Sequence, residues 1–187
     1  MATTRTITDA ELLGLPKDGK YELVDGEIRV RPAGWKHEIV VMLLGARLTA
    51  FVEQQRLGQV LGSNTLYALP GGNRRGPDVS FVAAGRLLPD SPPIPRLAPD
   101  LAVEILSPDD SPREVLDKVG EYLQSGVRLV WVIDPAGRKA VVHRSLTDVR
   151  EITDKSDLEG EDVIPAYAPM PRSGAKPRSL AAGPRLN

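Results

Sequence analysis

The stretch PDLAVEILSPDDSPREVLDK, residues 99–118, decides the fold. Residues 101–106 are apolar at nearly every position, which predicts a β-strand buried on both faces in the centre of a sheet. Glu104 interrupts this apolar run. An ionised carboxylate in such a strand is costly to desolvate unless a cation, a metal or hydrogen-bond donors compensate it. Glu104 is therefore a candidate site residue.

A helix is predicted over residues 112–125, directly after this strand. Pro112 takes the first helical position, Ser111 and Glu114 form a capping-box pattern, and Gly126 is placed to end the helix. Lys118 borders the packed side of this helix, so its long side chain could carry the ammonium back toward the strand. Residues 127–133 form a second apolar strand, and the strand–helix–strand order predicts a right-handed βαβ crossover.

A second carboxylate, Asp78, stands at the start of another apolar run, residues 79–82. Two strands that each deliver one acid could converge on a hard divalent cation such as Mg²⁺, which prefers oxygen ligands and keeps several waters for phosphate chemistry. Structural roles are the alternative. Glu104 could form a buried ion pair with Lys118 or an arginine, and Asp78 could cap its strand.

The remaining segments predict helices and strands that alternate, which indicates an α/β or α+β class around a mixed sheet. They are a short helix after Thr8, a hairpin of residues 20–24 and 27–30 around Asp25-Gly26, a helix over 36–57 stopped by Gly58, one or two strands within 60–69, and an outer strand over 139–144.

The length of 187 residues suits one domain with a full-sized core, which we assign to residues 1–168. Residues 169–187 carry four prolines and four basic residues and are predicted to be a disordered tail. No apolar run is long enough to span a membrane, and the N-terminus lacks the apolar stretch of a signal peptide. The chain has no cysteine, which excludes disulfides and thiolate metal sites and favours a cytoplasmic location.

The charge balance counts against tight, autonomous DNA binding. The chain has 24 basic and 25 acidic residues and a formal net charge of −1, whereas proteins that grip nucleic acid through phosphate neutralisation usually carry a basic surplus or stripe. A local basic patch could still form if the fold brings together Arg31, Lys36, Arg74 and Arg75.

Six motifs in consecutive order resemble the Uma family of restriction endonucleases, within the PD-(D/E)XK nuclease superfamily. They span about residues 10–165 and comprise YELVDGE (21–27), His37, RGPDV (75–79), PDLAVEILSP (99–108), Lys118 with Tyr122, and GVRLVWVIDP (126–135). The resemblance implies a restriction-endonuclease-like α/β (α+β) fold, with a mixed central sheet flanked by helices and an N-terminal β-hairpin.

The resemblance also implies the metal ligands and the catalytic residues. Asp78, Glu104 and the backbone carbonyl of Ile105 would bind Mg²⁺ or Mn²⁺. The superfamily lysine lies two positions after the second acid, but this chain has Leu106 there. Lys118 on the following helix is therefore the expected substitute.

Three further residues complete the predicted site. By the resemblance, Glu22 is expected to be an auxiliary acid near the site, and His37 and Arg75 to contact the substrate. For His37, a solvated or helix-capping histidine is an equally weighted alternative.

The resemblance implies a Mg²⁺-dependent endonuclease that hydrolyses DNA phosphodiester bonds with a metal-activated water. A homodimer would suit cleavage of both strands by one site per chain. Two alternatives stay open: a noncatalytic or partner-dependent scaffold that keeps the nuclease fold for binding or dimerisation, and a nuclease acting on RNA or single strands.

Overall fold

The computed structural model describes residues 6–16, 19–31, 34–88, 90–153 and 155–167. Its elements, in chain order, are α1 (Asp9–Leu13), β1 (Lys20–Val24), β2 (Glu27–Arg31), α2 (Trp35–Gln55), β3 (Gly58–Gly62), β4 (Tyr67–Ala68), β5 (Arg74–Arg75), β6 (Val79–Ala83), the 3₁₀ turn η1 (Ala84–Arg86), β7 (Leu101–Ile105), α3 (Pro112–Gln124), β8 (Leu129–Asp134), β9 (Lys139–His143) and β10 (Val149–Thr153). Among the described helices, none is long and apolar enough to cross a membrane. The predicted tail at 169–187 lies outside the described residues.

A six-stranded mixed sheet, ordered β10-β9-β8-β7-β6-β3, forms the centre of the fold. β7 and β8 pair in parallel and are joined through α3, whereas the other neighbours are antiparallel. The predicted mixed sheet and its parallel strand–helix–strand unit are confirmed. A smaller sheet, ordered β2-β1-β5-β4, contains the predicted hairpin, whose Asp25 and Gly26 both have positive φ as a tight two-residue turn requires.

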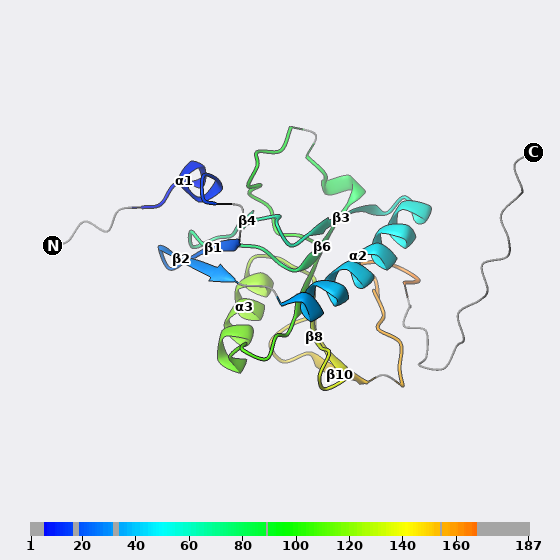
Figure 1. Cartoon of the computed structure of the whole chain (residues 1–187). Coiled ribbons are helices and arrows are strands. Elements are labelled where there is room, and N and C mark those ends of the chain that lie inside the picture. The colour runs from blue at the N-terminus through cyan, green and yellow to red at the C-terminus, as the bar shows by residue number, and fades with distance from the viewer. Residues whose placement is uncertain (1–5, 17–18, 32–33, 89, 154, 168–187) are drawn as a thin grey trace, which may run out of the picture.

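The two long helices, α2 and α3, cover opposite faces of the large sheet (Figure 1). Side chains alternate along β7, so some of its residues face α2 and the others face α3. Leu101 and Val103 belong to the core cluster that includes the buried residues of α2. Ala102 belongs to the other cluster, with Val119 of α3. Because side chains alternate along a strand, Glu104 lies on the same side as Ala102, facing α3.

Two helix ends differ from the sequence predictions. α3 begins at Pro112, but the Ser111 side chain makes no capping hydrogen bond, and Glu114 pairs with Arg29 at 3.6 Å instead. α2 ends at Gln55, followed by Arg56 in the left-handed conformation, so Gly58 is not its stop. Gly58 instead begins β3, where a Cβ would lie 2.1 Å from the Val82 carbonyl oxygen.

The predicted outer strand at 139–144 is wrong in its position. β9 lies between β8 and β10, so β10 is the edge strand on that side. β10 is an additional strand that the sequence pattern did not indicate. Its charged residues Arg150 and Glu151 suit an edge, where charged side chains discourage pairing with another chain.

Candidate active site

Asp78 and Glu104 come from neighbouring antiparallel strands at the same level of the sheet. Val79 of β6 pairs with Val103 of β7, and Asp78 and Glu104 are the next residues beyond this pair on their two chain segments. The Asp78 N–H donates to the Val103 carbonyl at 2.9 Å. The N–H of Ile105, the residue after Glu104, in turn donates to Asp78 Oδ2 at 2.8 Å. Strand pairing therefore brings together the two buried acids that the sequence nominated.

The Asp78 carboxylate is held by three donors from three parts of the chain. Its Oδ1 accepts from Lys20 Nζ at 2.8 Å, and its Oδ2 accepts from the Ile105 N–H at 2.8 Å and lies 3.1 Å from His37 Nε2. Burial would raise the pKa of Asp78, but the hydrogen bond from His37, together with Lys20 and the Ile105 N–H, holds this pKa well below its usual range. Asp78 is therefore ionised at neutral pH.

The Glu104 carboxylate is bound by two side chains of α3. Lys118 Nζ donates to Oε2 at 2.9 Å and the Tyr122 hydroxyl donates to Oε1 at 2.7 Å. Lys118 and Tyr122 are four residues apart and so share one face of the helix. Burial and the neighbouring carboxylates of Glu104 and Glu22 raise the pKa of Tyr122 well above its usual value, so its hydroxyl stays a donor. The predicted reach of Lys118 to the strand of Glu104 is observed.

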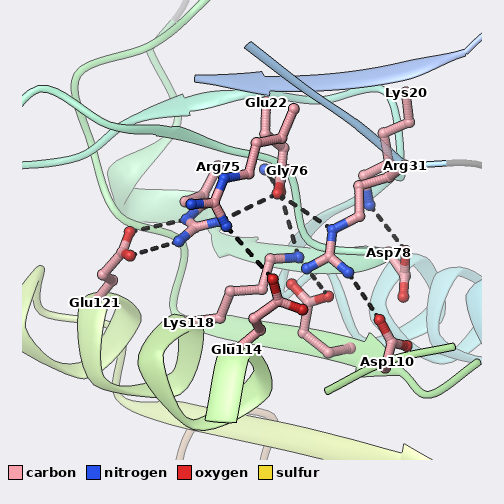
Figure 2. A network of polar contacts seen from close by, with 12 residues as sticks. Lys20, Glu22, Arg31, Arg75, Gly76, Asp78, Asp110, Glu114, Lys118 and Glu121 are labelled. Atoms are coloured by element: carbon pink, nitrogen blue, oxygen red, sulfur yellow. Dashed lines mark hydrogen bonds and ion pairs between the residues drawn. The ribbon is translucent and has the colours of Figure 1, made fainter. Parts of the chain in front are cut away.

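Glu22 joins the same network from β1 (Figure 2). It is fully buried, and its Oε1 lies 3.3 Å from Lys118 Nζ and accepts from the Gly76 N–H at 2.9 Å. Burial acts to raise the pKa of Glu22, but Lys118, Lys20 and the Gly76 N–H lower it below its usual value. Lys118 thus bridges two carboxylates, Glu22 and Glu104.

Arg75 and Arg31 both contact Glu22, and each also pairs with a second acid. Arg75 is buried and contacts Glu22 at 3.3 Å, and its guanidinium grips Glu121 of α3 with two hydrogen bonds. Arg31 lies 3.6 Å from Glu22 and 2.8 Å from Asp110. These guanidinium groups face carboxylates, so phosphate binding by Arg75 stays a prediction.

A pocket of about 410 Å³ opens beside these arginines, between the hairpin and α3. Its lining is mixed in charge, with Arg29, Arg31 and Arg75 facing Glu114 and Glu121. The pocket does not include Lys36 or Arg74, and Arg74 pairs with Asp9 at 2.7 Å. Of the four basic residues considered as a DNA-binding patch, Arg31 and Arg75 line this pocket, and a patch formed by all four stays a prediction.

Lys20 joins this polar network through Asp78, and the sequence pattern did not indicate it. Burial acts to lower the pKa of its ammonium, but the carboxylates of Asp78, Glu104 and Glu22 together raise it above the usual value. Lys20 therefore stays charged, because the three carboxylates around it stabilise its ammonium. The available signal was the two-residue spacing between Lys20 and Glu22, which puts both on one face of β1.

Asp78 and Glu104 are the residues best placed to hold a divalent metal. Within the described part of the chain, no group of three or more His, Cys, Asp or Glu side chains converges as a metal cage. Mg²⁺ seldom needs such a cage, because it binds through one or two carboxylates and completes its shell with waters and substrate phosphate oxygens. The two neighbouring carboxylates fit that requirement, and in the structure Lys20 and Lys118 form ion pairs with them.

The two histidines of the chain are expected to titrate on opposite sides of the ordinary value of about 6.5. The hydrogen bond to Asp78 raises the pKa of His37, whereas burial lowers the pKa of His143. Because folding raises the pKa of His37, its charge stabilises the fold at acid pH, and this contribution is lost as the pH rises through the raised pKa. NMR titration of the ring protons in EDTA measures both values.

The Asp78→Asn variant provides the control for this titration. The pKa of His37 should fall toward its ordinary value while that of His143 stays unchanged, since only His37 contacts Asp78. A His37 pKa that does not respond to the substitution would show that the contact carries no charge interaction.

Comparisons with known proteins identify the fold and the family of this chain. A crystal structure described as "a putative nuclease belonging to DUF820", from Anabaena variabilis, superposes with a TM-score of 0.76 at 24% sequence identity, covering 87% of this chain and 93% of that one. The comparison confirms the predicted nuclease-like fold. No curated protein matches the chain in sequence. Residues 9–173 match the model of the Uma2 family, described as "Putative restriction endonuclease", which confirms the resemblance, and the chain belongs to that family.

Proposed function

We propose that this protein is a metal-dependent endonuclease that hydrolyses DNA phosphodiester bonds, with Mg²⁺ or Mn²⁺ as its cofactor. The observation that carries the proposal is that Asp78 and Glu104 lie next to the paired residues Val79 and Val103 of two neighbouring central strands, with Lys118 2.9 Å from Glu104. Family membership supports a nuclease that acts on DNA.

Asp78 and Glu104 would hold the metal, with the Ile105 carbonyl as a further ligand. Bound there, the metal would supply Lewis-acid chemistry, lowering the pKa of a coordinated water and offsetting charge on the scissile phosphate. The Ile105 N–H already fixes the Asp78 carboxylate at 2.8 Å. This bond restricts the carboxylate before any ligand arrives, which lowers the reorganisation that binding requires.

Lys118 is the residue that would stabilise negative charge on the attacking oxygen or the phosphate. Its ammonium has three donor hydrogens, and Glu104 and Glu22 occupy two directions in the structure. A third donor remains for a substrate oxygen. Glu22, fixed by the Gly76 N–H, would orient the ammonium and act as the auxiliary acid.

Lys20 and His37 would balance the charge of Asp78 while substrate and metal are absent. Both contact this carboxylate, and both are only slightly exposed at the side chain, 12% for Lys20 and 11% for His37. On metal binding their positive charges would turn toward the phosphate, where an ammonium or imidazolium offsets charge that develops during hydrolysis. His37 would thereby serve as a substrate contact.

A plasmid-nicking assay on the full chain tests the proposal. Wild type is expected to convert supercoiled plasmid to open-circular or linear DNA with Mg²⁺ or Mn²⁺ and to stop in EDTA. Glu104→Gln should lose both cleavage and the Mn²⁺ binding measured by isothermal titration. Glu27→Gln, an exposed residue of the hairpin, is the matched control and should retain both.

A noncatalytic scaffold is the second candidate function. The observation that favours it is that every acid in the network already has a cationic partner. Together with the net charge of −1, this would suit a structural ion-pair network. If neither wild type nor Glu104→Gln binds Mn²⁺ and neither cuts plasmid, the scaffold replaces the nuclease.

A further inference from the structure

α2 exposes an apolar surface on the side that faces away from the sheet. We call this surface the outer stripe of α2; it consists of Trp35, Ile39, Met42, Leu43, Ala46 and Ala50, all exposed. Trp35 is 73% exposed and Met42 66%. The spacing of three and four residues puts the six on one helical face.

The opposite face of α2 is already buried in the core, through Val41, Leu44, Leu48 and Val52. α2 is therefore apolar on both of these faces. A surface helix of a soluble domain usually carries polar residues on its outer side, and a helix that is apolar all round is normally covered. No described residue buries the outer stripe, which identifies it as a contact surface.

The sizes and charges of the residues along the stripe would make two copies of it complementary when they pack antiparallel. The large residues Trp35, Ile39, Met42 and Leu43 occupy the N-terminal half, whereas the C-terminal half has Ala46 and Ala50. Lys36 and Glu53 flank the stripe at its two ends, and both are exposed. An antiparallel pair of such helices would set large residues against small ones and each lysine against a glutamate.

We propose that two copies of this chain form a symmetric dimer in which the outer stripes of α2 pack antiparallel. The two-fold axis passes at the level of Leu44 and Gly45, so that Leu43 faces Ala46 and Ile39 faces Ala50 of the second copy. The end charges then form two Lys36–Glu53 pairs between the copies. A parallel pair would instead stack large residues on large ones and like charges on like, which favours the antiparallel arrangement.

The dimer does not depend on nuclease activity, but it would serve it. His37, which contacts Asp78, lies in the first turn of α2 beside Trp35 and Lys36. Dimerisation through α2 would therefore join two active sites in one assembly, which would suit cleavage of both strands of a duplex.

Single cysteines test the direction of packing, because the chain has no cysteine of its own. From the helical rise, the two copies of residue 46 are offset by about 5 Å along the helix axis and those of residue 50 by about 16 Å. Under mild oxidation, Ala46→Cys should form a disulfide-linked dimer on a non-reducing gel, and Ala50→Cys should form little. Equal cross-linking of the two variants would overturn the antiparallel arrangement.

Light scattering during size-exclusion chromatography tests the dimer itself. Wild type should elute with the mass of two chains at micromolar concentration. Glu53→Lys should raise the dissociation constant by about tenfold, since it replaces two attractions with repulsions, and adding Lys36→Glu should restore the wild-type value. Asp117→Lys, an exposed residue of α3, is the control and should leave association unchanged.

Two results would overturn the dimer. One is a wild-type chain that stays monomeric with no cross-linking of Ala46→Cys. The other is a full chain that is monomeric while a chain ending at Tyr167 is dimeric, because residues 168–187 would then cover the stripe themselves.

Discussion

Asp78→Asn is expected to reduce plasmid cleavage by at least about 100-fold, the upper end of the cost of altering a group that supports a metal site. The amide keeps the shape of the side chain but loses its charge and one acceptor oxygen. It can still accept from the Ile105 N–H, but its NH₂ group would then face the ammonium of Lys20, a donor against a donor. Initial rates of plasmid nicking at saturating Mg²⁺ measure the loss.

The same substitution also removes charge-assisted hydrogen bonds, so the unfolding free energy should fall by about 1–3 kcal/mol. Cleavage is therefore compared at a temperature where circular dichroism shows both proteins folded. Asp117→Asn is the matched control, because Asp117 is exposed on α3. An Asp78→Asn protein that is folded and still cuts at more than a tenth of the wild-type rate would remove Asp78 from the metal site.

The central fold could be predicted because its signals are local in the sequence. β7 and β8 are short, continuous apolar runs, and Pro112 and Gly126 bracket α3. Glu104 was conspicuous because it is the one charged residue in the apolar run at 101–106. A charged side chain inside a buried strand must be compensated by a cation, a metal or hydrogen-bond donors, so Glu104 could be singled out as a candidate site residue.

Several pairings within the site could not be predicted because they join distant parts of the chain. Lys20 and Asp78 are 58 residues apart, and Arg75 and Glu121 are 46 apart. Hydrophobic periodicity tells which face a residue occupies, but it does not tell which residue lies across from it. The same limit applies to the two-residue strands β4 and β5, whose pairing depends on β1 and on each other.

Lys118→Met is expected to lower the unfolding free energy at pH 7 by about 3–5 kcal/mol, the usual cost of removing one partner of a buried ion pair. Methionine keeps most of the volume of the side chain but leaves two buried carboxylates, Glu22 and Glu104, without the ammonium between them. Urea denaturation followed by circular dichroism measures the loss. Lys139→Met, at an exposed pair with Glu151, is the control and should change the stability little.

The pH dependence separates this electrostatic loss from a packing defect. In wild type, the pKa of Glu22 is lowered on folding, so its stabilising contribution is present above the unfolded pKa and is lost as the pH falls through the folded pKa. In Lys118→Met the lowering of the Glu22 pKa by Lys118 is lost, so Glu22 takes up a proton more readily and the difference from wild type should shrink toward acid pH. A difference that is constant with pH would indicate packing alone.

Adding Glu104→Gln to Lys118→Met should recover part of the lost stability, because the double variant removes one of the two unpaired charges. Full recovery would show that Glu104 alone accounts for the cost, and partial recovery would assign the remainder to Glu22, which keeps its charge and its bond from the Gly76 N–H. If the double variant is no more stable than Lys118→Met, then Lys118 does not bridge the two acids in solution. The proposed role of Glu22 in orienting the catalytic ammonium would then lose its basis.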